Sequence, residues 1–254
     1  MGEDESRTAL VRKLENFFGK KVILIVYNPE FEGGVVPGDE RFIGWVIDKE
    51  RKNEPINNCI LILSGSGGDF KTALHSSYIL RNWLSYYACF VPSVAGSALC
   101  YLILHSNKLL MGKNSLLTQI DPLFEHKGLF YRAIKNLDNE NEEIKNKSHD
   151  IFNHVTGQLQ KLLSHKNSLV GFRDFKPGDM SPIIYLFMGK EDHESGVRYA
   201  ELSKLNLNID LVQDEIVNDA NYLIALCRRE LSEENSRLVI HTKEGGYFLK
   251  LFSR

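Results

Sequence analysis

A strand-like apolar run that ends in two adjacent glycines constrains the fold more than any other stretch of this chain. Residues 61–69 read Leu-Ile-Leu-Ser-Gly-Ser-Gly-Gly-Asp, and the run stops at Gly67 and Gly68. Residues 94–99 read Val-Ala-Gly-Ser-Ala-Leu and lead into an apolar segment with helical character, so Ser97 stands at the start of a predicted helix. Glycine N–H groups can stabilise an oxyanion, and a helix N-terminus can hold a nucleophile. The two stretches together favour acyl-transfer chemistry.

Apolar runs separated by turn residues predict an α/β fold with parallel strand pairing. We expect strands at residues 21–27, 59–63, 88–91 and 108–111, and a short extended segment at 115–120. The apolar run 183–188 also has the character of a strand. Helical spacing predicts helices at residues 5–18, 69–84, 96–105, 197–205 and 213–231, and residues 129–170 are helix-compatible. Residues 237–252 predict a β-hairpin that turns at Gly245 and Gly246.

Composition limits the classes of function. The chain has 254 residues, of which 43% are hydrophobic and 25% charged, as in a soluble globular protein with a full core. A net charge of −2 provides no basic surface for nucleic acid. The most apolar window, residues 95–104, is too short to span a bilayer. The four cysteines have no metal-ligand spacing and predict buried, reduced thiols in a cytoplasmic protein; they are Cys59, Cys89, Cys100 and Cys227.

Three blocks of sequence carry a resemblance to a known family. The first is Gly-Ser-Gly-Gly at residues 65–68. The second runs from Gly-Ser-Ala-Leu at residues 96–99 to Ile-Asp-Pro at residues 120–122. The third is Gly-Lys-Glu-Asp-His at residues 189–193, followed by a helix-like segment at 200–205. In this order, the blocks resemble the serine dehydrogenase proteinase family of the ClpP/crotonase superfamily, over roughly residues 20–210.

The resemblance implies a fold and an activity. The fold would be a ClpP/crotonase-like α/β core of repeated β-β-α units. We expect an N-terminal helix at residues 1–20, a catalytic domain at 21–210, and a C-terminal helix and hairpin at 211–254. The activity would be that of a serine peptidase acting on peptides or unfolded protein, with no cofactor or metal. Relatives of this type are commonly multimeric, so we also expect a homo-oligomer.

The same resemblance assigns roles to individual residues. Ser97 would attack the scissile carbonyl, His193 would take its proton, and Asp121 would hold the imidazole. Backbone N–H groups would form the oxyanion hole, with candidates at Gly67, Gly68 and Ala98.

Alternative assignments remain open for the base and for the function. His126 lies near the segment where ClpP keeps its histidine, and Lys113 could serve in a Ser-Lys dyad. Residues 65–72 also match the sequence motif of a phosphate-binding P-loop at all but one position, and a P-loop would indicate a nucleotide hydrolase. Phe70 stands where that loop needs glycine, and Asp69 would repel phosphate. The second alternative function is that of a catalytically silent oligomeric scaffold with the same fold.

Overall fold

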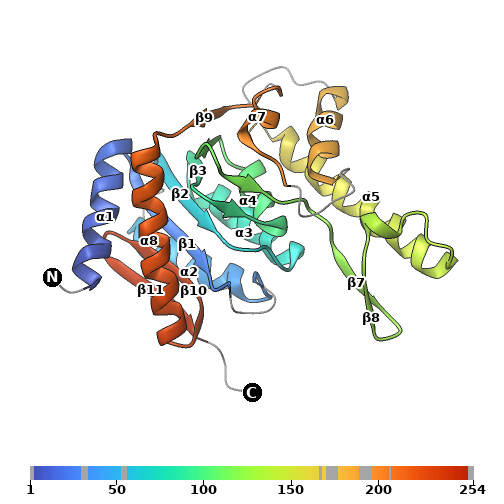
Figure 1. Cartoon of the computed structure of the whole chain (residues 1–254), viewed down its shortest axis with the longest axis horizontal. Coiled ribbons are helices and arrows are strands. Elements are labelled where there is room, and N and C mark those ends of the chain that lie inside the picture. The colour runs from blue at the N-terminus through green and yellow to red at the C-terminus, as the bar shows by residue number, and fades with distance from the viewer. Residues whose placement is uncertain are drawn as a thin grey trace.

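A seven-stranded sheet forms the centre of the molecule in the computed structural model, which describes residues 3–29, 34–52, 56–165, 168–169, 177–188, 196–205 and 207–250 (Figure 1). In spatial order its strands are β11 (Gly245–Lys250), β10 (Ser236–Thr242), β1 (Lys21–Tyr27), β2 (Cys59–Ser64), β3 (Tyr87–Val91), β5 (Lys108–Met111) and β9 (Ile209–Leu211). The five strands from β1 to β9 run parallel, whereas β10 is antiparallel to both β1 and β11. The parallel pairing predicted from the sequence is therefore confirmed.

Helices cover both faces of this sheet (Figure 1). They are α1 (Glu3–Phe18), α2 (Asp39–Arg51), α3 (Phe70–Trp83), α4 (Cys100–Leu104), α5 (Glu142–Ser164), α6 (Pro177–Met188), α7 (Tyr199–Leu202) and α8 (Asp214–Glu233), with 3₁₀ turns η1 (Ser97–Leu99) and η2 (Ile134–Asn136). Among the described residues, none of these helices is both long and apolar enough to cross a membrane.

Strand β1 shows why the sheet needs a helix layer on each side. Its side chains alternate between the two faces, as a strand requires. Leu24 packs in one apolar cluster with residues of α1 and α8. Ile23 and Ile25 pack in a second cluster with residues of α2, α3 and α4. All three side chains are fully buried, which explains the continuous apolar run that predicted this strand.

Two short ladders stand outside the main sheet. Strand β4 (Val94–Ala95) pairs in parallel with β6 (Leu116–Leu117), so β3 and β5 are each followed by a short second strand. Strands β7 (Leu123–His126) and β8 (Leu129–Arg132) form an antiparallel hairpin that projects from the body beside α5 (Figure 1).

The structure corrects three of the expected elements. Residues 183–188 belong to α6 and form no strand, because a short apolar run does not by itself distinguish the two structures. Residues 129–132 form β8 instead of the start of a helix. Asp39 and Glu40, expected at the end of a loop over residues 28–40, begin α2, a helix that no predicted element covers. The C-terminal hairpin is observed, and it joins the main sheet through the pairing of β10 with β1.

Candidate active site

The two glycine-containing turns identified in the sequence lie side by side. The N–H of Gly96 donates to the carbonyl of Gly65 at 2.9 Å, and Gly65 and Ala95 form a parallel bridge. This bridge continues the sheet beyond the carboxyl end of β2. It brings the turn after β2 against the turn after β4, and the carboxyl ends of parallel strands are where α/β proteins commonly place ligand sites.

Gly67 lies in direct contact with the serine turn. Its φ is +106°, which glycine adopts without strain. A Cβ at Gly67 would lie 2.7 Å from the Cβ of Ser97 and 2.8 Å from the carbonyl oxygen of Gly96. Both separations are shorter than real Cβ contacts. Glycine is therefore required here both by the backbone conformation and by the approach of Ser97.

Ser97 has a left-handed backbone conformation, with φ at +42°. This conformation is uncommon for a residue with a side chain, and such strain is found often at functional sites. The N–H of Ser97 donates to the Oγ1 of Thr118 at 2.9 Å, and the thiol of Cys100 donates to the carbonyl of Thr118 at 3.2 Å. The segment after β6 therefore holds the serine turn in place.

The backbone N–H groups near Ser97 include two that could bind an anion. The chain around Gly68 is held by bonds from the Val35 N–H to the Gly67 carbonyl, at 2.6 Å, and from the Asp69 N–H to the Val35 carbonyl, at 2.7 Å. Ala98 is the second residue of η1, where the N–H groups of a helical turn have no partner within it. Within the described part of the chain, no hydrogen bond uses the N–H of Gly68 or Ala98.

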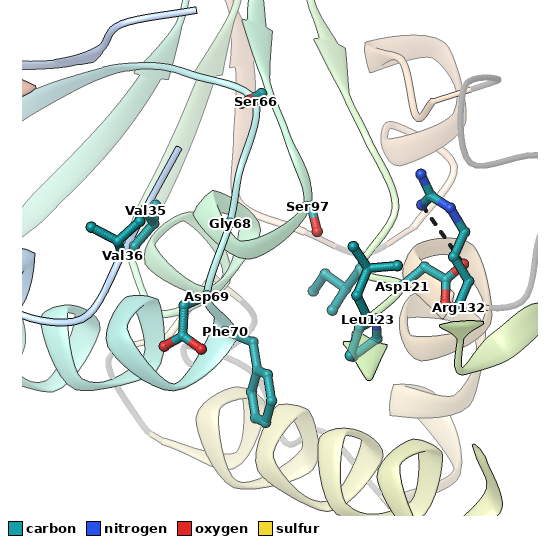
Figure 2. A pocket seen from close by; sticks show the side chains of 12 residues that line it. Val35, Val36, Ser66, Gly68, Asp69, Phe70, Ser97, Asp121, Leu123 and Arg132 are labelled. Atoms are coloured by element: carbon teal, nitrogen blue, oxygen red, sulfur yellow. Dashed lines mark ion pairs between the residues drawn. The ribbon is translucent and has the colours of Figure 1, made fainter. Parts of the chain in front are cut away.

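Ser97 opens into a cavity of about 450 Å³ (Figure 2). Its side chain is half-buried and points into this space, and Gly68 lies on the wall nearby. The other lining residues come from the loop before α2, the start of α3, the segment after β6 and the β7–β8 hairpin; they are Val35, Val36, Ser66, Asp69, Phe70, Ile120, Asp121, Pro122, Leu123 and Arg132. The cavity thus combines apolar walls with a few polar groups, as ligand sites commonly do.

The Val35–Val36 wall is anchored by a buried carboxylate. Asp39, at the start of α2, accepts a hydrogen bond from the Val36 N–H at 2.9 Å and forms an ion pair with Arg237 at 2.7 Å. Burial raises the pKa of Asp39 to about 6, although the Val36 N–H and the Arg237 charge both favour the ionised form. These contacts connect the cavity wall to β10, on which Arg237 lies.

Asp121 lies in the cavity that holds Ser97, and its side chain is 3% exposed. One carboxylate oxygen accepts a hydrogen bond from the Ile134 N–H at 3.0 Å. The other lies 3.9 Å from the guanidinium Nη1 of Arg132. Asp121 thus shares the cavity with the candidate nucleophile, and these contacts tie it to η2 and β8.

The candidate bases are distributed over different parts of the molecule. His126 lies on β7 and contacts Glu143 of α5, with 3.3 Å between Nε2 and a carboxylate oxygen; it does not line the cavity of Ser97. Lys113 lines a different cavity, beside α8. His193 lies outside the residues that the structure describes. Among the described residues that line the cavity of Ser97 there is no histidine or lysine.

The start of α3 differs from a phosphate-binding loop. The carboxylate of Asp69 accepts hydrogen bonds from the N–H of Thr72 at 2.8 Å and from its hydroxyl at 2.7 Å. A P-loop would present these donors to a phosphate or to its magnesium ion. Lys71 is exposed and does not line the cavity. These contacts argue against the nucleotide-hydrolase alternative. In the described part of the chain, no group of three or more His, Cys, Asp or Glu residues could hold a metal ion.

Two residues at this site were not singled out in the sequence. Thr118 stands two residues before Ile120-Asp-Pro, and its role in holding Ser97 depends on the pairing of β4 with β6. Arg132 reaches the cavity because the β7–β8 hairpin folds back on itself. Since pairing between separated segments brings each residue to the cavity or its edge, no local sequence pattern marks either of them.

Comparison with known proteins identifies the fold. No family model matches the sequence, and no curated protein matches it. Among solved structures, a serine-to-alanine mutant of the 1510-N membrane-bound stomatin-specific protease is similar over 88% of this chain and 88% of its own, with a TM-score of 0.50 and 14% identity. The fold is the ClpP/crotonase-like α/β fold. At this level of identity the likeness concerns the fold alone.

Two further ClpP/crotonase-like structures are similar at lower TM-scores. A mutant of ClpP1 from Listeria monocytogenes is 10% identical and matches over 81% of this chain and 99% of its own, with a TM-score of 0.44. A putative enoyl-CoA hydratase from Streptomyces coelicolor A3(2) is 12% identical and matches over 85% of this chain and 71% of its own, with a TM-score of 0.41.

Proposed function

We propose that this protein is a serine peptidase that cleaves peptide bonds in peptides or unfolded protein, with Ser97 as the nucleophile. The main support is the conformation of Ser97, which has φ at +42° at the first residue of a helical turn and a side chain directed into a cavity. A nucleophile on a tight turn at a helix start is accessible to a substrate carbonyl. The N–H groups of Gly68 and Ala98 would bind the oxyanion.

The proposed reaction proceeds through an acyl-enzyme. The Ser97 Oγ attacks the carbonyl carbon while a base takes the hydroxyl proton, and the resulting oxyanion accepts hydrogen bonds from the two N–H groups. The C–N bond then breaks, and the protonated base gives its proton to the leaving amine. Water, activated by the same base, attacks the ester and releases the acid, which restores the Ser97 hydroxyl.

We assign the base to His193 from the resemblance in its sequence block, with Asp121 holding the imidazole. Asp121 lies in the cavity, and its Ile134 and Arg132 contacts fix the carboxylate in position. His126 is the alternative base. Its contact with Glu143 directs it toward α5, so this assignment would require His126 to leave that partner.

Covalent labelling tests the nucleophile directly. A fluorophosphonate should modify Ser97, identified by mass spectrometry of the labelled peptide. Ser97→Ala should remove the label and lower peptide hydrolysis by several orders of magnitude, on the order of 10⁶-fold where a serine acts within a triad. Ser66→Ala is the matched control, because Ser66 is an exposed serine that lines the same cavity.

Two results would contradict the proposed nucleophile. The first is unchanged hydrolysis by Ser97→Ala. The second is an unlabelled Ser97 in a folded, stable oligomer without peptidase activity, which would favour the silent scaffold.

A pair of histidine variants tests the base. His193→Ala should abolish most of the hydrolysis and the rise of rate with pH that a histidine base produces, whereas His126→Ala should retain both. The measurement is kcat/KM against pH for each variant. The reverse pattern would assign the base to His126.

A further inference from the structure

The cavity of Ser97 contains an arginine that takes no direct part in the proposed catalytic steps, although it contacts the carboxylate of Asp121. Arg132 is the last residue of β8, and its side chain is 40% exposed at the cavity wall. Figure 2 shows Arg132 beside Asp121, with Leu123 between this pair and Ser97 in the view. Because Ser97 and Arg132 line the same cavity, a substrate bound to Ser97 could also contact the guanidinium.

The guanidinium of Arg132 has unused hydrogen-bonding capacity. Its described side-chain contact is the ion pair with Asp121, at 3.9 Å, which is longer than a hydrogen bond. A guanidinium carries five N–H donors in a planar arrangement. Within the described part of the chain, no side-chain hydrogen bond from Arg132 is formed, so these donors are available to a ligand.

The other charges of the cavity do not compete for the same position. Asp121 is buried against Arg132 and accepts from the Ile134 N–H, so its negative charge is compensated. Asp69 accepts from both the N–H and the hydroxyl of Thr72, and Figure 2 shows its carboxylate on the far side of the cavity from Arg132. Arg132 is therefore the one cationic side chain among the described lining residues of this cavity.

We infer that Arg132 binds a carboxylate of the substrate, and that the peptidase prefers peptides with an acidic side chain or a free C-terminus close to the scissile bond. The inference rests on the proposed function. A carboxylate matches the planar donors of a guanidinium and can accept two hydrogen bonds from it. The nearby apolar residues Leu123 and Phe70 would contact uncharged parts of the same peptide.

A structural role for Arg132 predicts a different outcome. The Arg132 guanidinium is 40% exposed and lies 3.9 Å from the Asp121 carboxylate, beyond hydrogen-bond distance, so water partly screens this ion pair. Loss of Arg132 should therefore change the choice among substrates more than the melting temperature. The useful measurement is a ratio of cleavage rates within one variant, because this ratio does not depend on the folded fraction of the preparation.

The experiment uses a peptide mixture prepared from a digested proteome, half of which is methyl-esterified to neutralise every carboxylate. The unsubstituted protein should cleave the untreated half faster, by roughly 10- to 100-fold, as expected for a charge-assisted hydrogen bond between Arg132 and a carboxylate. Arg132→Gln should reduce this ratio to near one. Arg229→Gln, an arginine on α8 paired with Glu233, should keep it.

Two further arms identify the source of the carboxylate. Peptides that are cleaved in the mixture are made synthetically. Each is compared with a form that carries a C-terminal amide, and separately with a form in which the Glu near the cleaved bond is replaced by Gln. Loss of cleavage with the amide assigns a free C-terminus, and loss with Gln assigns an acidic side chain; either result supports the inference.

The result that would overturn the inference is equal cleavage of both halves of the mixture, or a preference that survives in Arg132→Gln. Fluorophosphonate labelling of Ser97 in the unchanged chain, measured in the same preparation, tests the proposed function separately. A labelled enzyme without carboxylate preference rejects only the role of Arg132.

Discussion

At the scale of single residues, the site depends on backbone conformations that few side chains tolerate. Gly67 and Gly68 have φ at +106° and +136°, and Ser97 has φ at +42°. A non-glycine residue in the left-handed region costs on the order of 1–3 kcal/mol. The bond from the Ser97 N–H to Thr118 and the packing of Gly67 against Ser97 hold this conformation in place. The favourable packing of the rest of the fold offsets the free-energy cost of this strained backbone.

Gly67→Ala should therefore disturb the site more than it disturbs the fold. The new methyl group would overlap the Ser97 Cβ and the Gly96 carbonyl, which would push the hydroxyl out of position. We expect the rate of fluorophosphonate labelling to fall by about 100-fold or more, as for misplacement of a catalytic group by about 1 Å. Unchanged labelling would show that the turn adapts without moving Ser97.

Gly157→Ala is the matched control for this substitution. Gly157 lies inside α5, and nothing lies within 4 Å of its Cβ position. Alanine there should leave labelling unchanged. It should also raise the free energy of unfolding by about 0.5–1 kcal/mol, because alanine favours a helix more than glycine does.

At the scale of elements, one buried carboxylate connects α2 with three strands. Glu50, near the end of α2, forms an ion pair with Lys21 of β1 at 2.5 Å. It also accepts hydrogen bonds from the hydroxyls of Thr242 on β10 and Tyr247 on β11, both at 3.0 Å. Burial by itself would raise the pKa of Glu50, but Lys21 and the two hydroxyls outweigh it, so the pKa is lowered.

This network should contribute to the pH dependence of stability. Because the pKa of Glu50 is lower in the folded chain, its contribution is present above the ordinary value of 4.5 and is lost as the pH falls through the folded pKa. Glu50→Gln should lower the free energy of unfolding at pH 7 by about 1–3 kcal/mol. It should also reduce the loss of stability that occurs as the pH falls below about 4.5, the ordinary pKa of the carboxyl group.

Urea unfolding at several pH values measures both effects. Glu142→Gln is the control, because Glu142 is an exposed residue at the start of α5 with a side chain that is 73% exposed. Its removal should change stability little. An unchanged pH slope in Glu50→Gln would show that the network does not titrate as described.

At the scale of the whole molecule, β11 forms one edge of the central sheet. Its residues Tyr247 and Leu249 are partly buried hydrophobics that pack against the core, and the outer side of β11 has no strand partner among the described residues. An unpaired edge strand presents free N–H and carbonyl groups to another chain. This arrangement supports the homo-oligomer predicted from the sequence.

Light scattering coupled to size exclusion should therefore give a mass above that of one chain at micromolar concentration. Dilution should lower the mass if the assembly is reversible. A single-chain mass throughout the micromolar range would reject the prediction. The result is independent of the peptidase proposal, because edge pairing does not involve the cavity of Ser97.

Local patterning was sufficient to predict most strands, the helices that follow the two glycine turns, and the α/β class. A buried parallel strand is a continuous apolar run, and a glycine pair indicates the turn that follows it. Both the strand and the turn can therefore be predicted from neighbouring residues of the sequence. The four cysteines follow the same logic: apolar neighbours predicted burial, and all four are buried and free. Run 183–188 was assigned wrongly because its six apolar residues are compatible with either a strand or a helix.

The surroundings of Ser97 could not be predicted in this way. Thr118 and Arg132 lie 21 and 35 positions further along the chain than Ser97, and they reach the site through the β4–β6 ladder and the β7–β8 hairpin. Strand order and register depend on how the whole apolar surface is buried, which no single segment encodes. The turn that carries Ser97 is therefore a local property of the sequence, whereas the cavity and the charge that faces it arise only when distant segments pack together.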